Sequence, residues 1–296
     1  MNRRLFLLRK NVIILAKELN TLTEKISQAI KILRDAKIIL IGAGAGLSTA
    51  AGLDHAGARF KKYFANFEKK YGFSDMYSGG FYPYETAGEF WAFWCRNIFY
   101  NRYDQPPSEI HKKLLQLVKD KIYFVITTNV DHLFQNNGFD KEKLFYTQGD
   151  YGLFQCPTPC HNKTYDNEET VRKMLAAEKN MSVPAELFPR CPKCGEMMTT
   201  NLRIDDTFVE DSGWKLAAAR YQSFLQKYLL DEIVYLELGV GANTPAIIKY
   251  PFWNFTSENP KARYICINKG ETAAPARIAK QSILIDADIK DFLQSI

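Results

Sequence analysis

The stretch IILIGAGAGLSTAAGLDHAGARF, from Ile38 to Phe60, decides the fold of this chain. It begins with four bulky apolar residues in a row, which is typical of a strand covered on both faces in a parallel sheet. Gly42, Gly44 and Gly46 then allow a sharp turn and a close approach of the backbone to a ligand. A strand, a glycine turn and the start of a helix together predict an anion-binding loop. The same glycines also fit an ordinary tight turn, and their spacing fits a dehydrogenase fingerprint poorly.

The composition is that of a globular protein. The 296 residues, 46% of them hydrophobic, allow one large core and a smaller satellite domain. A net charge of +6 without a long basic block argues against a nucleic-acid partner. No apolar stretch approaches the ~20 residues needed to cross a bilayer, and Arg9 and Lys10 interrupt an N-terminal run that otherwise resembles a secretion signal. We therefore expect a cytoplasmic protein without a membrane partner.

Five further apolar runs predict the rest of the parallel sheet. Most of them end in polar or glycine residues, and ligands bind at the carboxyl ends of the strands in open α/β sheets. We therefore expect these ends to form one pocket. The runs are 122–127, 143–147, 233–238, 264–267 and 282–285, and the segments that follow include Thr127–Asp131, Gln148–Asp150, Gly239–Thr244, Asn268–Lys269 and Asp286–Asp288.

Two helical regions are predicted beside the sheet. Apolar residues at steps of three and four from Ile13 to Ala36 indicate one face of a long helix, and the first eleven residues precede this pattern. The aromatic segment from Phe60 to Tyr103 is predicted to be a helical insertion. We expect the rings of Trp91 and Trp94 to be core rather than cofactor ligands. Ser108 is placed to cap the next helix.

Four of the six cysteines form two closely spaced pairs, which thirty residues separate. Four thiolates in two knuckles suit a tetrahedral zinc ion, which would be structural because the protein takes all four positions. The alternative is two disulfides or free thiols, and a cytosolic location disfavours disulfides. His161, next to Cys160, could replace one thiolate as a ligand. The pairs are Cys156 with Cys160 and Cys191 with Cys194, whereas Cys95 and Cys266 are isolated in apolar surroundings and are predicted to be core residues.

These motifs together resemble the sirtuins, an NAD-consuming family with a Rossmann-like domain and a small zinc-bearing module. The resemblance extends from Ile38 to the C-terminus. It implies an α/β fold in which residues 12–58, 121–155 and 203–296 form the Rossmann-like domain, 59–120 a helical insertion and 156–202 the zinc-binding module. The residues that carry it are Gly44-Ala45-Gly46-Leu47-Ser48 with Gly52, Thr127-Thr128-Asn129-Val130-Asp131 with Gly138, the two cysteine pairs, Gly239 to Pro245, Ile267-Asn268 and Asp286-Ala287-Asp288.

The chain departs from the family pattern at two places. It has Gln148 before Gly149 where sirtuins carry a histidine before a glycine, and Gly52-Leu53-Asp54-His55-Ala56-Gly57 where they read Gly-Ile-Pro-Asp-Phe-Arg. In deacylating sirtuins this histidine acts as a base toward the nicotinamide ribose. An amide has no titratable proton near neutral pH, so Gln148 can bind a hydroxyl but cannot replace the base.

Gln148, the segment LDHAGARF (Leu53–Phe60) and Asn201-Leu202-Arg203 resemble class M sirtuins, the macrodomain-linked microbial branch. The resemblance implies an NAD-dependent protein ADP-ribosyltransferase. It also implies a lipoylated glycine-cleavage-H-like carrier as acceptor and a macrodomain hydrolase as functional partner. The implied catalytic residues are Asn129, Asp131, Gln148 and Arg203, and the implied NAD contacts are Gly44, Ala45, Gly46, Ser48, Asp54, Asn129, Asp131, Gln148, Gly239, Val240, Gly241, Asn243, Thr244, Asn268 and Asp288.

The residues leave other functions open. Arg203 also fits a surface ion pair. A deacylase in which water or His132 replaces the missing histidine is one alternative to the transferase, and a nucleotide sensor without turnover is another. Nicotinamide release distinguishes the sensor from both enzymes, and the mass change of the acceptor distinguishes transfer from deacylation.

Overall fold

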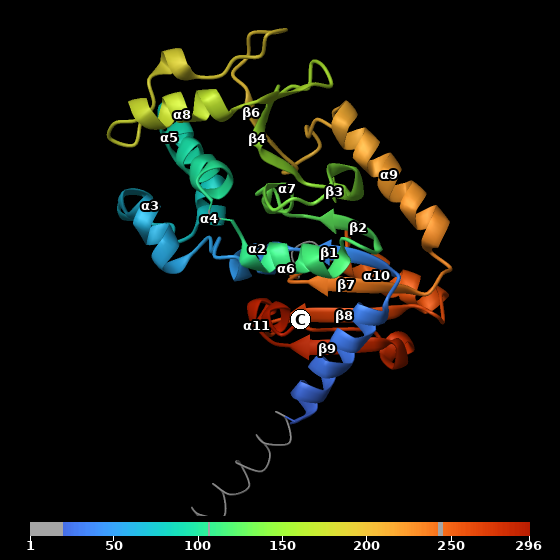
Figure 1. The fold of residues 1–296 in the computed structure, drawn as a ribbon. Coiled ribbons are helices and arrows are strands. Elements are labelled where there is room, and N and C mark those ends of the chain that lie inside the picture. Colours follow the sequence, from blue (N-terminus) through green and yellow to red (C-terminus); the bar gives the residue numbers. More distant parts are fainter. Residues whose placement is uncertain (1–19, 106, 242–244) are drawn as a thin grey trace, which may run out of the picture. The chain divides into compact units, whose positions relative to one another are not determined.

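The computed structural model describes residues 20–105, 107–241 and 245–296. Six strands lie in one sheet, namely β1 (Ile38–Ala43), β2 (Ile122–Thr127), β3 (Leu144–Tyr146), β7 (Ile233–Leu238), β8 (Arg263–Asn268) and β9 (Ser282–Asp286). Their order is β3-β2-β1-β7-β8-β9 (Figure 1). β1 pairs in parallel with β7, β7 with β8, and β8 with β9. The predicted Rossmann-like sheet is confirmed.

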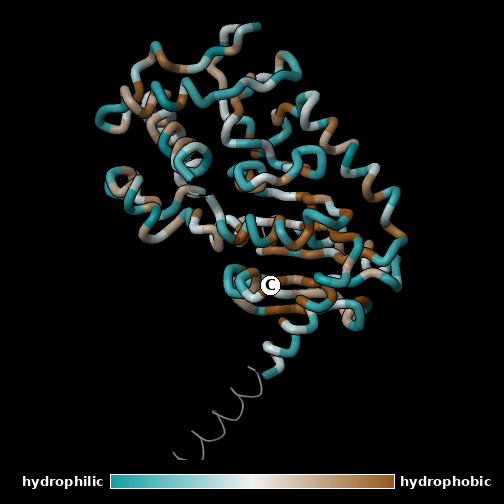
Figure 2. The backbone as a smooth tube through the Cα atoms, in the orientation of Figure 1, coloured by the Kyte–Doolittle hydropathy of each residue, from teal (hydrophilic) through white to brown (hydrophobic). Residues whose placement is uncertain are grey.

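The strands of this sheet are apolar because both of their faces are covered. Every residue of β1 and β7 is buried, and Figure 2 shows the sheet as one of the most hydrophobic parts of the backbone trace. Helix α10 (Lys249–Glu258) and the residue before it pack so closely that a Cβ on Gly42 would lie 2.3 Å from Ile248 and 2.7 Å from Phe252. Cys266 on β8 is fully buried, as predicted for a core cysteine.

The chain divides into two compact units. The first contains the described residues up to Gly46 together with Lys113–Val125 and Phe224–Ile296, and so holds β1, β7, β8 and β9. The second contains Leu47–Lys112 and Ile126–Ser223. The three-part domain division expected from the resemblance has other boundaries and stays a prediction.

The helix that follows Ser108 begins where the sequence predicted. Residues 20–35 are helical, while the earlier part of the helix predicted from Ile13 lies outside the described residues. The Ser108 hydroxyl accepts a hydrogen bond from the His111 amide at 3.4 Å, as expected for a cap. The other helices are α2 (Ala45–Ala50), α3 (Gly57–Tyr71), α4 (Met76–Gly80), α5 (Ala87–Ile98), η1 (Phe99–Tyr103), α6 (Glu109–Val118), α7 (Leu133–Asn136), η2 (Lys141–Lys143), α8 (Glu168–Ala177), η3 (Ala185–Leu187), α9 (Ser212–Tyr228), η4 (Ala276–Gln281) and α11 (Ile289–Gln294).

The second unit has an aromatic core. Trp91 is fully buried and Trp94 nearly so, which confirms that these rings are structural. The Trp91 ring meets Phe154 edge to face, with centroids 5.2 Å apart, and Phe67 packs in the same cluster. Cys95 is also fully buried there, as predicted.

A second sheet was not predicted from the sequence. It consists of β4 (Gly149–Gln155), β5 (Thr164–Asp166) and β6 (Thr199–Leu202) in the order β5-β4-β6, and its pairs are antiparallel. β4 contains two glycines, and β5 and β6 are three and four residues long, so that none shows a clear strand pattern. This sheet places Gln148 beside Arg203.

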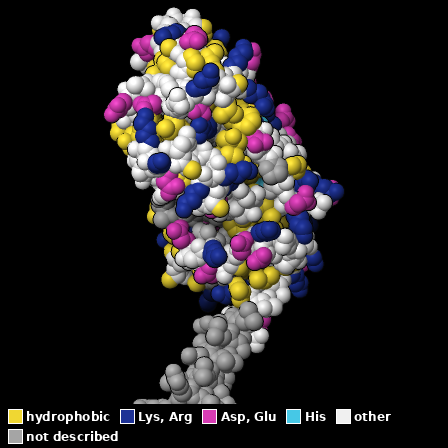
Figure 3. All heavy atoms as spheres, turned by 90° about the vertical axis from the view of Figure 1, so that its left-hand side faces the viewer, with side chains coloured by type: hydrophobic (Ala, Val, Ile, Leu, Met, Phe, Trp, Pro, Cys, Tyr) yellow, Lys and Arg dark blue, Asp and Glu magenta, His cyan; other side chains and the backbone are white. Residues whose placement is uncertain are grey.

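Surface properties agree with the composition. Among the described residues, no helix has the length and apolar character needed to cross a membrane. On the face drawn in Figure 3, Lys and Arg side chains are interspersed with Asp and Glu, and no large basic area is visible. The cytoplasmic location stays a prediction.

Candidate functional site

In the first unit, the glycine turn after β1 packs against the loop after β7. The Gly44 amide donates to the Leu238 carbonyl, and the Gly46 amide donates to the Gly239 carbonyl, both at 3.0 Å. A Cβ on Gly44 would lie 2.6 Å from the Gly239 oxygen, and one on Gly46 would lie 2.7 Å from Gly239 Cα. The close approach between these two loops therefore requires the glycines. It also occupies the Gly44 and Gly46 amides, which belong to the loop that the sequence predicted to bind an anion.

Several of the predicted NAD contacts lie at the carboxyl edge of the same sheet. Asn268 at the end of β8 donates from Nδ2 to the Val240 carbonyl at 3.3 Å. Asp288 accepts a hydrogen bond from the Lys290 amide at 2.8 Å and thereby caps α11. Gly241 is the last described residue of its segment, and Asn243 and Thr244 lie outside the described residues.

In the second unit, Asp131 braces the loop that follows β2. Its carboxylate accepts hydrogen bonds from the Ser48 hydroxyl and, at 2.9 Å, from the Leu133 amide, while its carbonyl accepts one from Gln105 Nε2 at 2.9 Å. Burial raises the pKa of Asp131, and the hydrogen bonds from Ser48 and Leu133 act in the opposite direction. Because both carboxylate oxygens are engaged, Asp131 positions the loop around it.

Hydrogen bonds connect three of the predicted catalytic residues. The Thr147 amide donates to the Thr127 carbonyl at 2.9 Å, and the Asn129 amide donates to the Thr127 hydroxyl at 3.0 Å. Gln148 Nε2 donates to the Thr147 hydroxyl at 3.3 Å. The Arg203 amide donates to the Gln148 carbonyl at 3.0 Å. The fold thus brings Asn129, Gln148 and Arg203 into one local network.

The Arg203 side chain is held by an ion pair and by two aromatic rings. Its Nη2 lies 2.5 Å from Glu210 Oε1, and its guanidinium carbon lies 4.4 Å from the ring centre of Phe208 and 5.3 Å from that of Trp214. Trp214 itself donates to the Thr147 carbonyl at 3.2 Å. Arg203 therefore forms an ion pair, which was one of the two interpretations of its sequence position. The two rings also hold its guanidinium in a defined place.

A histidine–carboxylate pair adjoins this network. His132 Nδ1 lies 2.5 Å from Asp150 Oδ2, and Arg102 Nε donates to Asp150 Oδ1 at 2.9 Å. His132 and Asp150 line a small crevice with Asn129 and Tyr146. Sequence reasoning did not find this pairing. Asp150 was noted only at a strand end, and nothing in the sequence pointed to Arg102.

Asp54, the remaining predicted NAD contact, lies in an exposed turn. Its side chain accepts a hydrogen bond from the Ala56 amide at 3.0 Å. The Arg59 guanidinium donates to the Asp54 carbonyl at 3.2 Å, to Asn101 Oδ1 at 2.7 Å and to the Tyr100 carbonyl at 2.7 Å. Arg59 therefore fixes the segment in which this chain departs from the sirtuin pattern.

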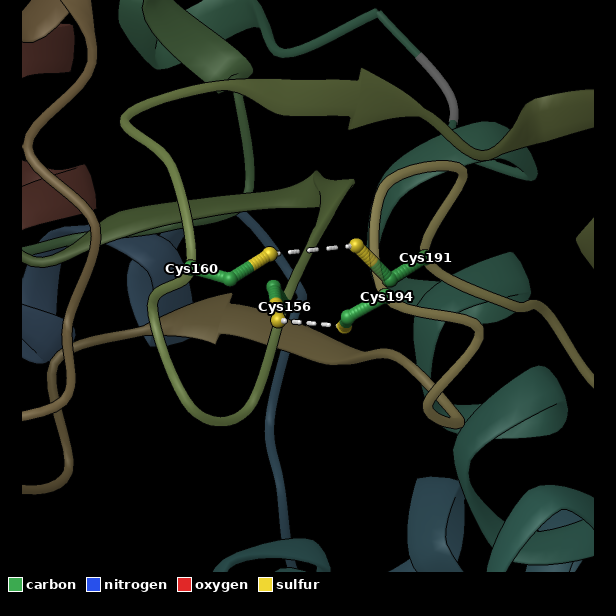
Figure 4. Close-up of side chains that lie close together, drawn as sticks. All are labelled: Cys156, Cys160, Cys191 and Cys194. Carbon is green, nitrogen blue, oxygen red and sulfur yellow. Dashed lines mark hydrogen bonds between the residues drawn. The ribbon is translucent and has the colours of Figure 1, made fainter.

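The two cysteine pairs converge from two loops (Figure 4). The four sulfur atoms lie within 4.8 Å of one another, with 3.6 Å between Cys156 and Cys194 and 3.6 Å between Cys160 and Cys191. Zinc–sulfur bonds of ~2.3 Å in a tetrahedron place the sulfurs ~3.8 Å apart. His161 Nδ1 lies 3.0 Å from the Cys160 sulfur and 4.0 Å from the Cys191 sulfur, and in the described part of the chain the group of possible metal ligands consists of the four cysteines alone. All six cysteines are free, and the cluster is compatible with a structural zinc ion.

Comparisons with known proteins agree with this geometry. The model of the Sir2 family matches residues 44–210. The chain is 38% identical over 275 residues to "Protein ADP-ribosyltransferase" of Staphylococcus aureus (strain Mu50 / ATCC 700699), which covers 91% of this chain and 87% of that protein. It is 31% identical over 243 residues to "Probable bifunctional ADP-ribose hydrolase/ADP-ribosyltransferase" of Fusarium oxysporum f. sp. cubense, covering 78% of this chain and 40% of that protein. A solved structure described as "The Structural basis for Sirtuin Substrate affinity" has a TM-score of 0.56 at 20% identity, over 91% of this chain and 95% of that chain, and shows a shared fold.

Proposed function

The chain belongs to the Sir2 family, and from that membership we propose that it is an NAD-dependent protein ADP-ribosyltransferase. The reaction releases nicotinamide and joins ADP-ribose to a protein acceptor. The names of the relatives from S. aureus and F. oxysporum support this activity. The observation in this chain that carries the proposal is Gln148 at the position where sirtuins have their histidine.

Gln148 separates transfer from deacylation for a chemical reason. Its amide donates to the Thr147 hydroxyl and has no group that accepts a proton near neutral pH. Losing a positioned general base slows a reaction by about 10²- to 10⁴-fold, which corresponds to roughly 3 to 5 kcal/mol. Deacylation needs that base after the glycosidic bond has broken. Direct capture of the ribose by an acceptor nucleophile does not need it at this position.

The proposed roles follow from the glycine turn after β1 and from the network that contains Asn129 and Arg203. NAD binds with its diphosphate at the Gly44–Ser48 turn, its adenosine near Gly239 and Asn268, and its nicotinamide ribose toward Asn129. Arg203 is always charged and orients a phosphate or an acidic group of the acceptor. One zinc ion on the four cysteines stabilises the fold and takes no part in the reaction.

The proposed acceptor is a lipoylated glycine-cleavage-H-like carrier protein, with a macrodomain hydrolase that removes the modification. The name of the F. oxysporum relative joins an ADP-ribose hydrolase to an ADP-ribosyltransferase, which supports such a partnership. The present chain spans 40% of that protein.

Replacement of Arg203 by alanine is expected to abolish labelling of the lipoylated carrier by NAD carrying a radioactive adenylate phosphate. The Asn129→Ala variant should behave in the same way, because positioning supplies most of the proposed catalysis. Arg172→Ala is a matched control, since Arg172 also pairs with a carboxylate, Glu168, at 2.7 Å and also lies over aromatic rings. The assay measures both products, free nicotinamide and the carrier with the added mass of ADP-ribose.

The alternative function is a deacylase in which His132 serves as the base, and the His132–Asp150 contact favours it over water alone. An acetyl-lysine peptide in the same assay tests it. Rapid removal of acetyl from the peptide, with no added mass on any carrier, would show that the transferase proposal is wrong.

A further inference from the structure

Gln155, the last residue of β4, is a buried polar residue whose side chain holds a neighbouring loop. Its exposed fraction is 2%. Its Oε1 accepts a hydrogen bond from the Val209 amide, and its Nε2 donates one to the Thr207 carbonyl, both at 2.9 Å. These partners fix the orientation of the side-chain amide, because a backbone N–H must face the oxygen and a carbonyl must face the NH₂ group. Gln155 therefore binds the peptide groups on both sides of Phe208.

Asn201 on β6 adds a second attachment to the same loop. Its Nδ2 donates to Gln155 Oε1 at 2.7 Å and to the Val209 carbonyl at 3.1 Å, and its exposed fraction is 3%. Three successive peptide groups between Thr207 and Glu210 are thus each held by a side-chain amide. A buried network of this kind is rigid when every member has a partner, and removal of one member leaves the others unsatisfied.

The loop that Gln155 holds carries two of the groups that contact the Arg203 side chain. The guanidinium carbon of Arg203 lies 4.4 Å from the ring centre of Phe208, and its Nη2 forms an ion pair with Glu210. The Arg203 side chain is 35% exposed, and a partly exposed ion pair by itself holds a long side chain weakly. The direction of the guanidinium therefore depends on how firmly the ring and the carboxylate are held.

We propose that Gln155 is a positioning residue for ADP-ribose transfer, which orients the Arg203 guanidinium through Phe208 and Glu210. This inference rests on the proposed function, in which Arg203 orients a phosphate or an acidic group of the acceptor. Gln155 itself touches no substrate. Recognition by a guanidinium depends on the direction of its N–H groups, and a displacement of about 1 Å at such a group lowers a rate by about 10²-fold.

Replacement of Gln155 by methionine tests this role. Methionine is flexible and close to glutamine in size, so it fills the same space but provides no partner for the peptide groups on either side of Phe208. We expect kcat/KM for the carrier protein, measured by nicotinamide release, to fall by about 10- to 10²-fold. Gln281→Met is the matched control, because Gln281 Nε2 also donates to backbone carbonyls, in the first unit. This control should melt earlier and keep its kcat/KM.

A double-mutant cycle with Arg203→Lys separates positioning from a general loss of structure. Lysine keeps the charge but lacks the planar set of donors that Gln155 is proposed to orient. In this background Gln155→Met should lower kcat/KM by at most about 2-fold, while its melting temperature should fall as much as in the unmodified background. Equal fold-losses of kcat/KM in the two backgrounds would overturn the proposal, and so would an unchanged kcat/KM in Gln155→Met alone. A loss transmitted through the neighbouring Cys156 would also be equal in both backgrounds.

An NMR spectrum of the arginine side chains tests the same role without turnover. Aromatic rings shift the signals of protons that lie over them, and Phe208 and Trp214 lie beside the Arg203 guanidinium. The Nε–H signal of Arg203 should move toward the position of a free arginine in Gln155→Met and stay in place in Gln281→Met. A signal that does not move in Gln155→Met would contradict the positioning role.

Gln155→Glu carries the same tests if Gln155→Met does not fold. A carboxylate keeps the oxygen that accepts from the Val209 amide and loses only the donor to the Thr207 carbonyl. Its losses should be smaller than those of Gln155→Met and should again depend on Arg203. If the unmodified enzyme labels no carrier, the proposed function itself fails, and the Arg203 signal still decides whether Gln155 positions the guanidinium.

Discussion

Removal of zinc from the four-cysteine cluster is expected to unfold the segment from Cys156 to Leu202. A structural zinc ion in small domains contributes about 10 to 16 kcal/mol of apparent binding free energy, which is largely free energy of folding. The effect should extend beyond the loops, because Cys156 and Cys191 are buried in the same hydrophobic cluster as Trp91 and Phe154. Loss of the metal should therefore loosen the aromatic core of the second unit.

Cys191→Ala and Cys95→Ala form a matched pair for this test. Both cysteines are buried in that cluster, but only Cys191 belongs to the group of four sulfurs. Cys95→Ala should keep one zinc per chain and lose about 1 kcal/mol of stability. Cys191→Ala should lose the metal and melt far earlier. Elemental analysis and thermal unfolding measure both quantities, and equal stability of the two variants would contradict the zinc assignment.

Replacement of Gly149 by alanine is expected to separate Gln148 from Arg203. Gly149 has a φ of 94°, and a Cβ there would lie 1.9 Å from the Asn201 carbonyl oxygen. Backbone strain and overpacking each cost about 1 to 3 kcal/mol of folding free energy, so we expect the variant to lose about 2 to 6 kcal/mol of stability. The same clash should disrupt the hydrogen bond from the Arg203 amide to the Gln148 carbonyl, and nicotinamide release should fall with it.

Gly72→Ala is the control for backbone strain alone. Gly72 has a φ of 82° at the end of α3, and no atom lies within 4 Å of the Cβ position. This variant should lose about 1 kcal/mol of stability and keep its nicotinamide-releasing activity. Denaturant unfolding and nicotinamide release measure both variants. Similar losses of stability and activity in the two variants would show that the clash with the Asn201 carbonyl oxygen does not disrupt the pairing of β4 with β6.

Local patterns were sufficient to predict the parallel sheet. The residues IILIGA of β1 and IVYLEL of β7 are all buried. A strand covered on both faces must be apolar along its whole length, so it is visible without knowledge of its neighbours. The cysteine pairs were visible for a similar reason, because each pair comes from one short loop.

The antiparallel sheet could not be predicted in this way. Gly149 at the start of β4 pairs with Leu202 at the end of β6, and a bulge interrupts the register before Phe154 pairs with Thr200. Short strands with glycines depend on their partners for stability, and these partners are distant in the sequence. The resemblance predicted Gln148 and Arg203 as site residues, but only the pairing of β4 with β6 places them together.

The sequence by itself determined the sheet, the ends of its strands and the kinds of polar groups that gather there. Tertiary structure alone decided which of these groups meet. Ser48 and Asp131 are 83 residues apart, Arg102 and Asp150 are 48 apart, and His132 and Asp150 are 18 apart. A buried carboxylate must be satisfied by whichever donors the packed chain places within hydrogen-bonding distance, and no local pattern specifies donors so distant in the sequence.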